Sequence, residues 1–122
     1  MRTEIERTFR IEAAHRLPHV PEDHKCARLH GHSFHITLHV AGPVDARLGW
    51  VIDFAEIDEA FAPLFKQLDH HYLNEVEGLD NPTSELLARW VLERVVLPAP
   101  AMLRAVTVAE TCMARCTVHA EG

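Results

Sequence analysis

The feature that most constrains the fold is a strict two-residue alternation of side chains over residues 30–40. In an extended strand, side chains two positions apart point to the same face. One face of this segment carries His30, His32, Phe34, Ile36, Leu38 and Val40, and the other carries Ser33, His35, Thr37 and His39. One apolar and one polar face are typical of an antiparallel sheet that is packed on a single side. The segment therefore predicts a strand in such a sheet.

Shorter patterns predict the remaining elements. The segment that ends at residue 15 alternates in the same way, as do residues 105–110, and a last short strand is expected at 115–119. A helix is expected after Asp53, in an Asp-x-x-Glu capping box, and a second after Thr83. Their apolar stripes are Phe54, Ile57, Phe61, Leu64, Phe65 and Leu68 in the first and Leu86, Leu87, Trp90, Val91 and Val95 in the second. Pro63 lies inside the first pattern, where it removes a hydrogen bond. The order predicts an α+β fold, ββααββ, with both helices on one face of a four-stranded antiparallel sheet.

Length, charge and cysteine usage set the broad class. The 122 residues are expected to form one domain, 1–122, and no apolar run is long enough to span a bilayer. The first residues lack the apolar stretch of a signal peptide, and the odd number of cysteines, Cys26, Cys112 and Cys116, favours free thiols in a reducing compartment. We therefore expect a cytoplasmic protein without a membrane partner. The net charge of −6 argues against nucleic acid as the main partner.

Histidine is unusually frequent, with ten in 122 residues. His30 and His32 share a strand face, and Gly31 between them leaves the backbone free to bend toward an ion. If the first two strands pair antiparallel, His15 reaches the same end of the sheet. Three neutral imidazoles with a fourth position open are the pattern of a catalytic zinc site. The alternative is that these histidines are packed core residues.

Cys26 lies four residues before His30, in the loop expected over residues 16–29. Lys25, Arg28 and a zinc ion would favour its thiolate form. A thiolate beside a metal is a good general base or nucleophile. The alternative is a structural cysteine or a fourth zinc ligand, which would close the site to substrate.

Two further positions carry candidate chemistry. Asp69 and His70 would form a proton relay if the carboxylate contacts the imidazole, although His70 and His71 as two solvated loop histidines are the rival interpretation. Glu110 ends an otherwise apolar strand face and needs a partner there. A ligand with paired N–H donors, such as a pterin or guanine edge, would satisfy this carboxylate, and so would a salt bridge to an arginine.

Several segments together resemble the 6-pyruvoyltetrahydropterin synthase family. They occur in order along nearly the whole chain, at residues 9–21, 25–34, 49–56, 68–74, 81–85 and 110–112. The resemblance is strongest to the bacterial branch that forms 6-carboxy-5,6,7,8-tetrahydropterin in the queuosine pathway. Some branches of the family carry glutamate in place of the thiol and make a folate precursor. Cys26 argues against that activity here.

The resemblance implies a zinc-dependent lyase with zinc ligands His15, His30 and His32, a catalytic thiol at Cys26, a relay of Asp69 and His70, and a pterin anchor at Glu110. It implies 7,8-dihydroneopterin triphosphate as substrate and 6-carboxytetrahydropterin, acetaldehyde and triphosphate as products. The family fold further implies sheets joined into an oligomeric barrel of trimers stacked as hexamers, with active sites between subunits. Two alternatives stay open: the pyruvoyl-forming activity of the same family, and a metal-binding assembly protein without catalysis.

Overall fold

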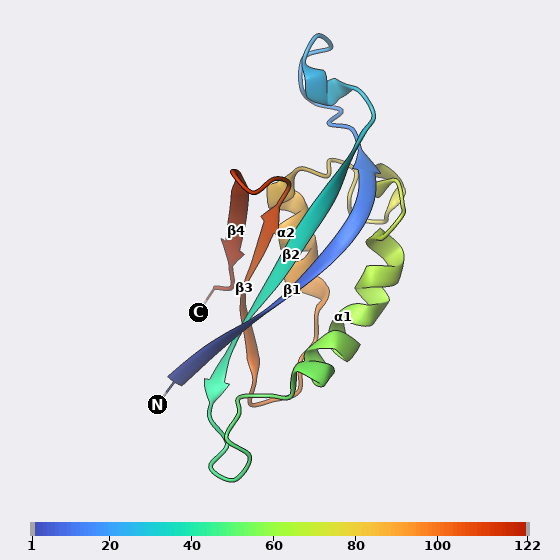
Figure 1. Ribbon diagram of the computed structural model, residues 1–122. Helices are drawn as coiled ribbons and strands as arrows, with labels where there is room; N and C mark the ends of the chain where they lie inside the picture. Colours follow the sequence, from blue (N-terminus) through green and yellow to red (C-terminus); the bar gives the residue numbers. More distant parts are fainter. Residues whose placement is uncertain (1, 122) are drawn as a thin grey trace.

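Two long strands, β1 (Arg2–His15) and β2 (His30–Pro43), dominate the computed structural model, which describes residues 2–121. They belong to a four-stranded antiparallel sheet in the order β1-β2-β3-β4, completed by β3 (Met102–Ala109) and β4 (Arg115–His119) (Figure 1). Helices α1 (Phe54–Leu68) and α2 (Ser84–Arg94) connect the two pairs of strands. The predicted ββααββ order and the antiparallel sheet are confirmed.

The helices begin at the predicted caps. The Asp53 carboxylate accepts a hydrogen bond from the Ala55 amide at 2.9 Å, and the Thr83 hydroxyl accepts one from the Leu86 amide at 3.1 Å. Such bonds satisfy backbone donors that the first helical turn leaves free. Pro63 stays inside α1 on its exposed side, so its missing amide leaves only one helical hydrogen bond unmade.

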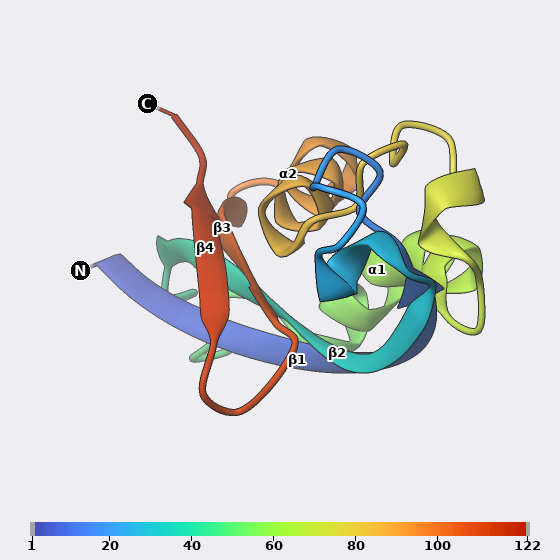
Figure 2. The same ribbon diagram turned by 90° about the horizontal axis from the view of Figure 1, so that it is seen from above.

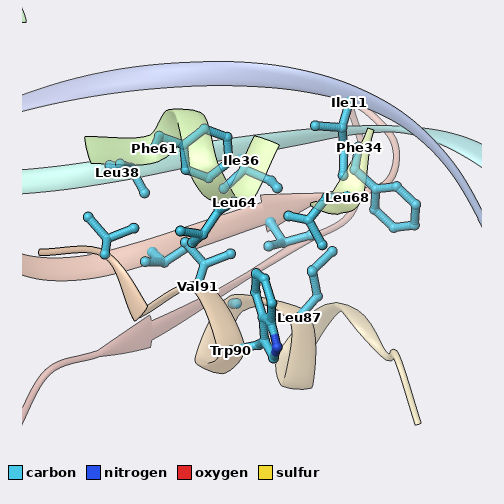
Figure 3. Packing of buried hydrophobic residues seen from close by; sticks show 14 of the residues in the cluster. Ile11, Phe34, Ile36, Leu38, Phe61, Leu64, Leu68, Leu87, Trp90 and Val91 are labelled. Carbon is cyan, nitrogen blue, oxygen red and sulfur yellow. The ribbon is translucent and has the colours of Figure 1, made fainter. Parts of the chain in front are cut away.

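Both helices cover one face of the curved sheet (Figure 2). Figure 3 shows the resulting core, where apolar side chains of the sheet meet those of both helices: Ile11, Phe34, Ile36, Leu38, Phe61, Leu64, Leu68, Leu87, Trp90 and Val91. The burial of this layer supplies the main driving force for the fold. The core reaches the strand ends that carry the histidines, where the Phe34 ring lies 5.2 Å from that of His15 and 5.4 Å from that of His32.

Two residues of the predicted apolar stripes are not in this core. The side chains of Phe54 and Leu86 are 48% and 39% exposed. Both lie in the first turn of their helix, where the side chain meets solvent rather than the sheet. In α2 the fully buried Ala88 packs in the core beside Leu87 and Val91.

The predicted loop over residues 16–29 extends beyond the end of the sheet and contains one short 3-10 helix, η1 (Lys25–Ala27) (Figure 1). A second one, η2 (Leu73–Glu75), lies between α1 and α2. No helix within residues 2–121 is long and apolar enough to cross a membrane.

Candidate metal centre and active site

The β1–β2 register brings three histidines together at one end of the sheet. His15 pairs with His30, and Ala13 pairs with His32, so all three imidazoles lie on the face that continues into the core. Their ring centroids are 4.5, 4.8 and 5.2 Å apart, and one donor nitrogen of each lies within 4.8 Å of the others. Ligand atoms at this spacing make the three histidines a candidate group for holding one metal ion.

The His15 ring is held in the tautomer that a metal needs. Its Nδ1 lies 2.8 Å from the carbonyl oxygen of Pro82, so Nδ1–H donates and Nε2 keeps its lone pair. This Nε2 is buried and has no hydrogen-bond partner among the described residues. Burial lowers the pKa of His15, with smaller contributions from His30 and His32 that act in the same direction. The ring is therefore neutral with an unsatisfied acceptor, which a cation would satisfy.

His30 follows the same pattern at the exposed rim. Its Nδ1–H donates to the carbonyl oxygen of Arg28 at 2.7 Å, which leaves the Nε2 lone pair free. Histidines that bind metal commonly donate their second ring N–H to a backbone carbonyl or carboxylate. Two fixed tautomers and one orphaned buried nitrogen fit a divalent metal with nitrogen ligands, such as zinc.

The thiol of Cys26 lies outside this group of donors. Within the part of the chain that the structure describes, the closely spaced metal-binding atoms belong to the three histidines alone. Cys26 is half-buried in η1, where its amide donates to Nδ1 of His24 and its carbonyl oxygen accepts from the Leu17 amide at 2.8 Å. The geometry thus places Cys26 on a loop anchored just beyond His15 and gives no support to a fourth-ligand role within this chain.

Asp69 and His70 are in contact, as the relay requires. The Asp69 carboxylate ends α1, where one oxygen accepts from the Glu12 amide at 2.9 Å and the other lies 2.8 Å from His70 Nδ1. His70 has a φ of 58°, in the left-handed region, and this turn brings the two adjacent side chains together. The pKa of Asp69 is lowered, mainly by the Glu12 amide and then by His70. A carboxylate held ionised favours the Nδ1–H tautomer of His70.

No hydrogen bond or ion pair among residues 2–121 joins Cys26 or His70 to the histidine triad. The His70 side chain is 76% exposed. Its free Nε2 therefore faces away from this chain's own core. The expectation that the site is completed between subunits stays a prediction.

Glu110 follows β3 directly and approaches the triad. Its Oε1 accepts from the Ser84 hydroxyl at 2.7 Å, and its Oε2 lies 3.8 Å from Nε2 of His32. The carboxylate lines a pocket of about 210 Å³ together with Ser84, Glu85, Ala114, Arg115 and Cys116. No ion pair between Glu110 and an arginine occurs among the described residues, so the salt-bridge alternative is not what the structure contains.

Residues 4–121 match the family model described as 6-pyruvoyl tetrahydropterin synthase. The chain belongs to this family. It is 42% identical over 113 residues to the 6-carboxy-5,6,7,8-tetrahydropterin synthase of Synechocystis, a match that covers 88% of this chain and 86% of the relative. It is 32% identical to a probable 6-carboxy-5,6,7,8-tetrahydropterin synthase of Halobacterium salinarum, over 87% of this chain and 79% of the relative.

Solved structures of family members share the fold. The 6-pyruvoyl tetrahydropterin synthase of Caenorhabditis elegans superposes with a TM-score of 0.89 at 28% identity, covering 99% of this chain and 97% of the other. The Plasmodium vivax 6-pyruvoyltetrahydropterin synthase, in a form whose catalytic glutamate is replaced by cysteine, superposes with a TM-score of 0.73 at 22% identity and shows the fold alone.

Sequence reasoning missed several residues that hold the site. Pro82 and Ser84 supply the partners of His15 and Glu110, and both lie in the Asn-Pro-Thr-Ser-Glu segment at 81–85. That segment was part of the family resemblance but carried no role. Glu12 supplies the backbone amide that holds Asp69. The Pro82 and Glu12 contacts use backbone groups, which no side-chain pattern signals, and the Ser84 hydroxyl meets Glu110 from 26 residues away.

Proposed function

We propose that this chain is a zinc-dependent 6-carboxytetrahydropterin synthase, which converts 7,8-dihydroneopterin triphosphate to 6-carboxy-5,6,7,8-tetrahydropterin, acetaldehyde and triphosphate. The single observation that carries the proposal is the triad of His15, His30 and His32, with the buried Nε2 of His15 left without a partner. The names of the Synechocystis and Halobacterium relatives support the product.

The bound metal would supply Lewis acidity, polarising side-chain oxygens of the substrate. The three imidazoles would hold it, and the Pro82 and Arg28 carbonyls fix the tautomers of His15 and His30. In these tautomers Nδ1 carries the proton, so Nε2 is the nitrogen that would bind the ion. The chain's remaining groups then act on the pterin ring and on the protons.

Glu110 would anchor the pterin. A carboxylate accepts two parallel hydrogen bonds, which match the paired N–H donors on a pterin edge. The Ser84 hydroxyl orients this carboxylate from one side, and His32 lies on the other. The anchor and the metal ligands are therefore neighbours, so a ring bound at Glu110 extends toward the triad.

Cys26 and the Asp69–His70 pair would move protons. A thiolate and an imidazole are both suitable general bases near neutral pH. His70 can exchange a proton at Nε2 because Asp69 engages its Nδ1. The exposed position of His70 is consistent with action on a substrate shared with a second subunit. We accordingly infer a homo-oligomer, a trimer or hexamer, in which the polar sheet face with His35 and Thr37 lines a tunnel.

The enzyme would act in the cytoplasm, and its product would enter queuosine biosynthesis. Incubation of the metal-loaded protein with 7,8-dihydroneopterin triphosphate, followed by assays for acetaldehyde and zinc content, tests the proposal. Acetaldehyde release that stops in chelator and returns with zinc is the expected result. Full turnover in chelator would refute the metal role, and an intact three-carbon side chain in the product would indicate the pyruvoyl-forming activity.

A relative with a different printed activity merits a parallel assay. The chain is 39% identical over 67 residues to the dihydroneopterin monophosphate aldolase of Pyrococcus furiosus, a match that covers 55% of each protein. Offering dihydroneopterin monophosphate beside the triphosphate separates the two activities. We expect turnover of the triphosphate only.

A further inference from the structure

The side chain of Asn74 pairs with the backbone of the residue that follows His15. Its Oδ1 accepts from the Arg16 amide at 2.9 Å, and its Nδ2 donates to the Arg16 carbonyl oxygen at 2.8 Å. A carboxamide can accept and donate at the same time, so it reproduces the pairing of a neighbouring peptide group. Asn74 lies in η2, whose neighbouring Leu73 is fully buried and fixes the helix against the core.

The second N–H of the same amide reaches a third segment. Nδ2 lies 3.4 Å from the carbonyl oxygen of Asp80, two residues before the Pro82 carbonyl that holds His15. On the other side, Arg16 precedes Leu17, whose amide donates to the Cys26 carbonyl oxygen. One side chain thus joins the exit of β1, the base of the Cys26 loop and the approach to α2.

We propose that Asn74 is a positioning residue, which holds the Cys26 loop and the Pro82 carbonyl in place around His15. Its importance for turnover rests on the proposed function, whereas its hydrogen bonds do not. Loops ordered by few buried contacts open easily, and residues 16–29 extend beyond the sheet (Figure 1). A clamp at the base of the loop therefore limits how far Cys26 moves relative to the metal ligands.

The inference requires both halves of the amide. Asn74→Leu has nearly the same shape and loses all three hydrogen bonds. Asn74→Asp retains an acceptor for the Arg16 amide, but its ionised carboxylate faces two carbonyl oxygens. At neutral pH, where an aspartate is ionised, Asn74→Asp should therefore lie between the wild type and Asn74→Leu, because it keeps the bond from the Arg16 amide and loses the two bonds that Nδ2 donates.

The test uses the metal-free full-length protein, with amide hydrogen exchange over residues 16–29 and alkylation of Cys26 mapped by peptide mass spectrometry. The control is Gln67→Met, which removes another side-chain amide donor, the 3.4 Å bond from Gln67 Nε2 to the Pro63 carbonyl oxygen on the exposed side of α1. In Asn74→Leu we expect exchange at Arg16 and Leu17 to rise roughly tenfold, which corresponds to the loss of one hydrogen bond of about 1.4 kcal/mol. The alkylation rate of the half-buried Cys26 should rise as well, because a released loop exposes its thiol. Zinc affinity should fall about tenfold, as for other groups that support metal ligands. Gln67→Met should leave the exchange, the alkylation rate and the zinc affinity near wild type.

Wild-type exchange and alkylation in Asn74→Leu would overturn the inference, and so would equal changes in Gln67→Met. If Asn74→Leu does not fold, Asn74→Asp at neutral pH decides the question, because its ionised carboxylate loses both donated hydrogen bonds, and wild-type exchange and alkylation in this variant overturn the inference. A wild type that binds no zinc and releases no acetaldehyde would instead refute the proposed function. The exchange and alkylation results would still test whether Asn74 holds the loop.

Discussion

Asp69 and His70 are adjacent in the chain, and Nδ1 of His70 nevertheless lies 2.8 Å from Oδ2 of Asp69. Adjacent side chains usually diverge, and here the left-handed φ of His70 turns them toward each other. The amide of His70 also donates to the Glu12 carbonyl oxygen, while the Glu12 amide donates to Asp69. This turn is therefore fixed to the edge of β1, and the relay does not depend on loop flexibility.

Asp69→Asn should make stability less sensitive to acid. The folded-state pKa of Asp69 is lowered, so the stabilisation it provides is present above its ordinary pKa of 3.8 and is lost as the pH falls through the folded-state pKa. Urea unfolding between neutral pH and pH 2 measures this. The free energy of unfolding of the wild type should drop more steeply below pH 3.8 than that of Asp69→Asn. Glu59→Gln, an exposed position on the same helix, is the control, and parallel curves for the wild type and Asp69→Asn would contradict the prediction.

Cys26→Ala should lower turnover by about 100-fold or more, the usual range for losing a general acid or base, while the protein keeps its zinc. Acetaldehyde release and metal content measured on the same sample separate the two properties. Cys112→Ala, an exposed cysteine in the turn before β4, should retain full turnover. Loss of zinc from Cys26→Ala would identify a ligand instead of a catalytic thiol.

Glu110→Gln should weaken pterin binding by about 10–100-fold, because a charge-assisted pair of hydrogen bonds becomes a neutral one. Ser84→Ala should have a smaller effect in the same direction, since it only releases one carboxylate oxygen. Ligand titration of the zinc-loaded proteins gives both dissociation constants. Glu93→Gln, near the other end of α2, serves as the control. An effect of Ser84→Ala larger than that of Glu110→Gln would mean that the serine, not the carboxylate, binds the ring.

His30→Ala should reduce zinc affinity by more than the roughly 10–100-fold that follows the loss of an outer hydrogen-bond partner. His35→Ala, on the opposite face of the same strand, should leave the affinity unchanged. Competition with a chromophoric chelator at neutral pH measures both variants. Equal losses in the two variants would place the metal elsewhere.

The strands, the helix starts and the neighbourhood of the triad could be predicted from the sequence because they follow local periodicity. Residues two apart in β2 share a face, so pairing β1 with β2 was enough to bring His15 to His30. The buried stripes were predicted less well at their ends: Phe54 and Leu86 have the right spacing, but their first-turn positions lie at the margin of the core.

The contacts that orient the site could not be predicted, because they join distant loops through backbone groups. Pro82 is 67 residues from His15, and Asn74 is 58 residues from Arg16. Neither separation belongs to a repeating pattern. The Pro82 carbonyl and the Arg16 backbone amide also carry no residue-specific signal. Such contacts depend on how α1 and α2 return the chain to the end of β1.

The pairing of His15 with His30 has a consequence for how the β1–β2 hairpin is selected during folding. A slip of one residue would set His15 opposite Gly31 and turn its ring to the far side of the sheet. A misaligned hairpin would then have at most two imidazoles for an ion that binds three. Metal binding therefore favours the correct β1–β2 register over registers that are shifted by one residue. A protein that holds the ion through all three histidines must have its two longest strands paired in that register.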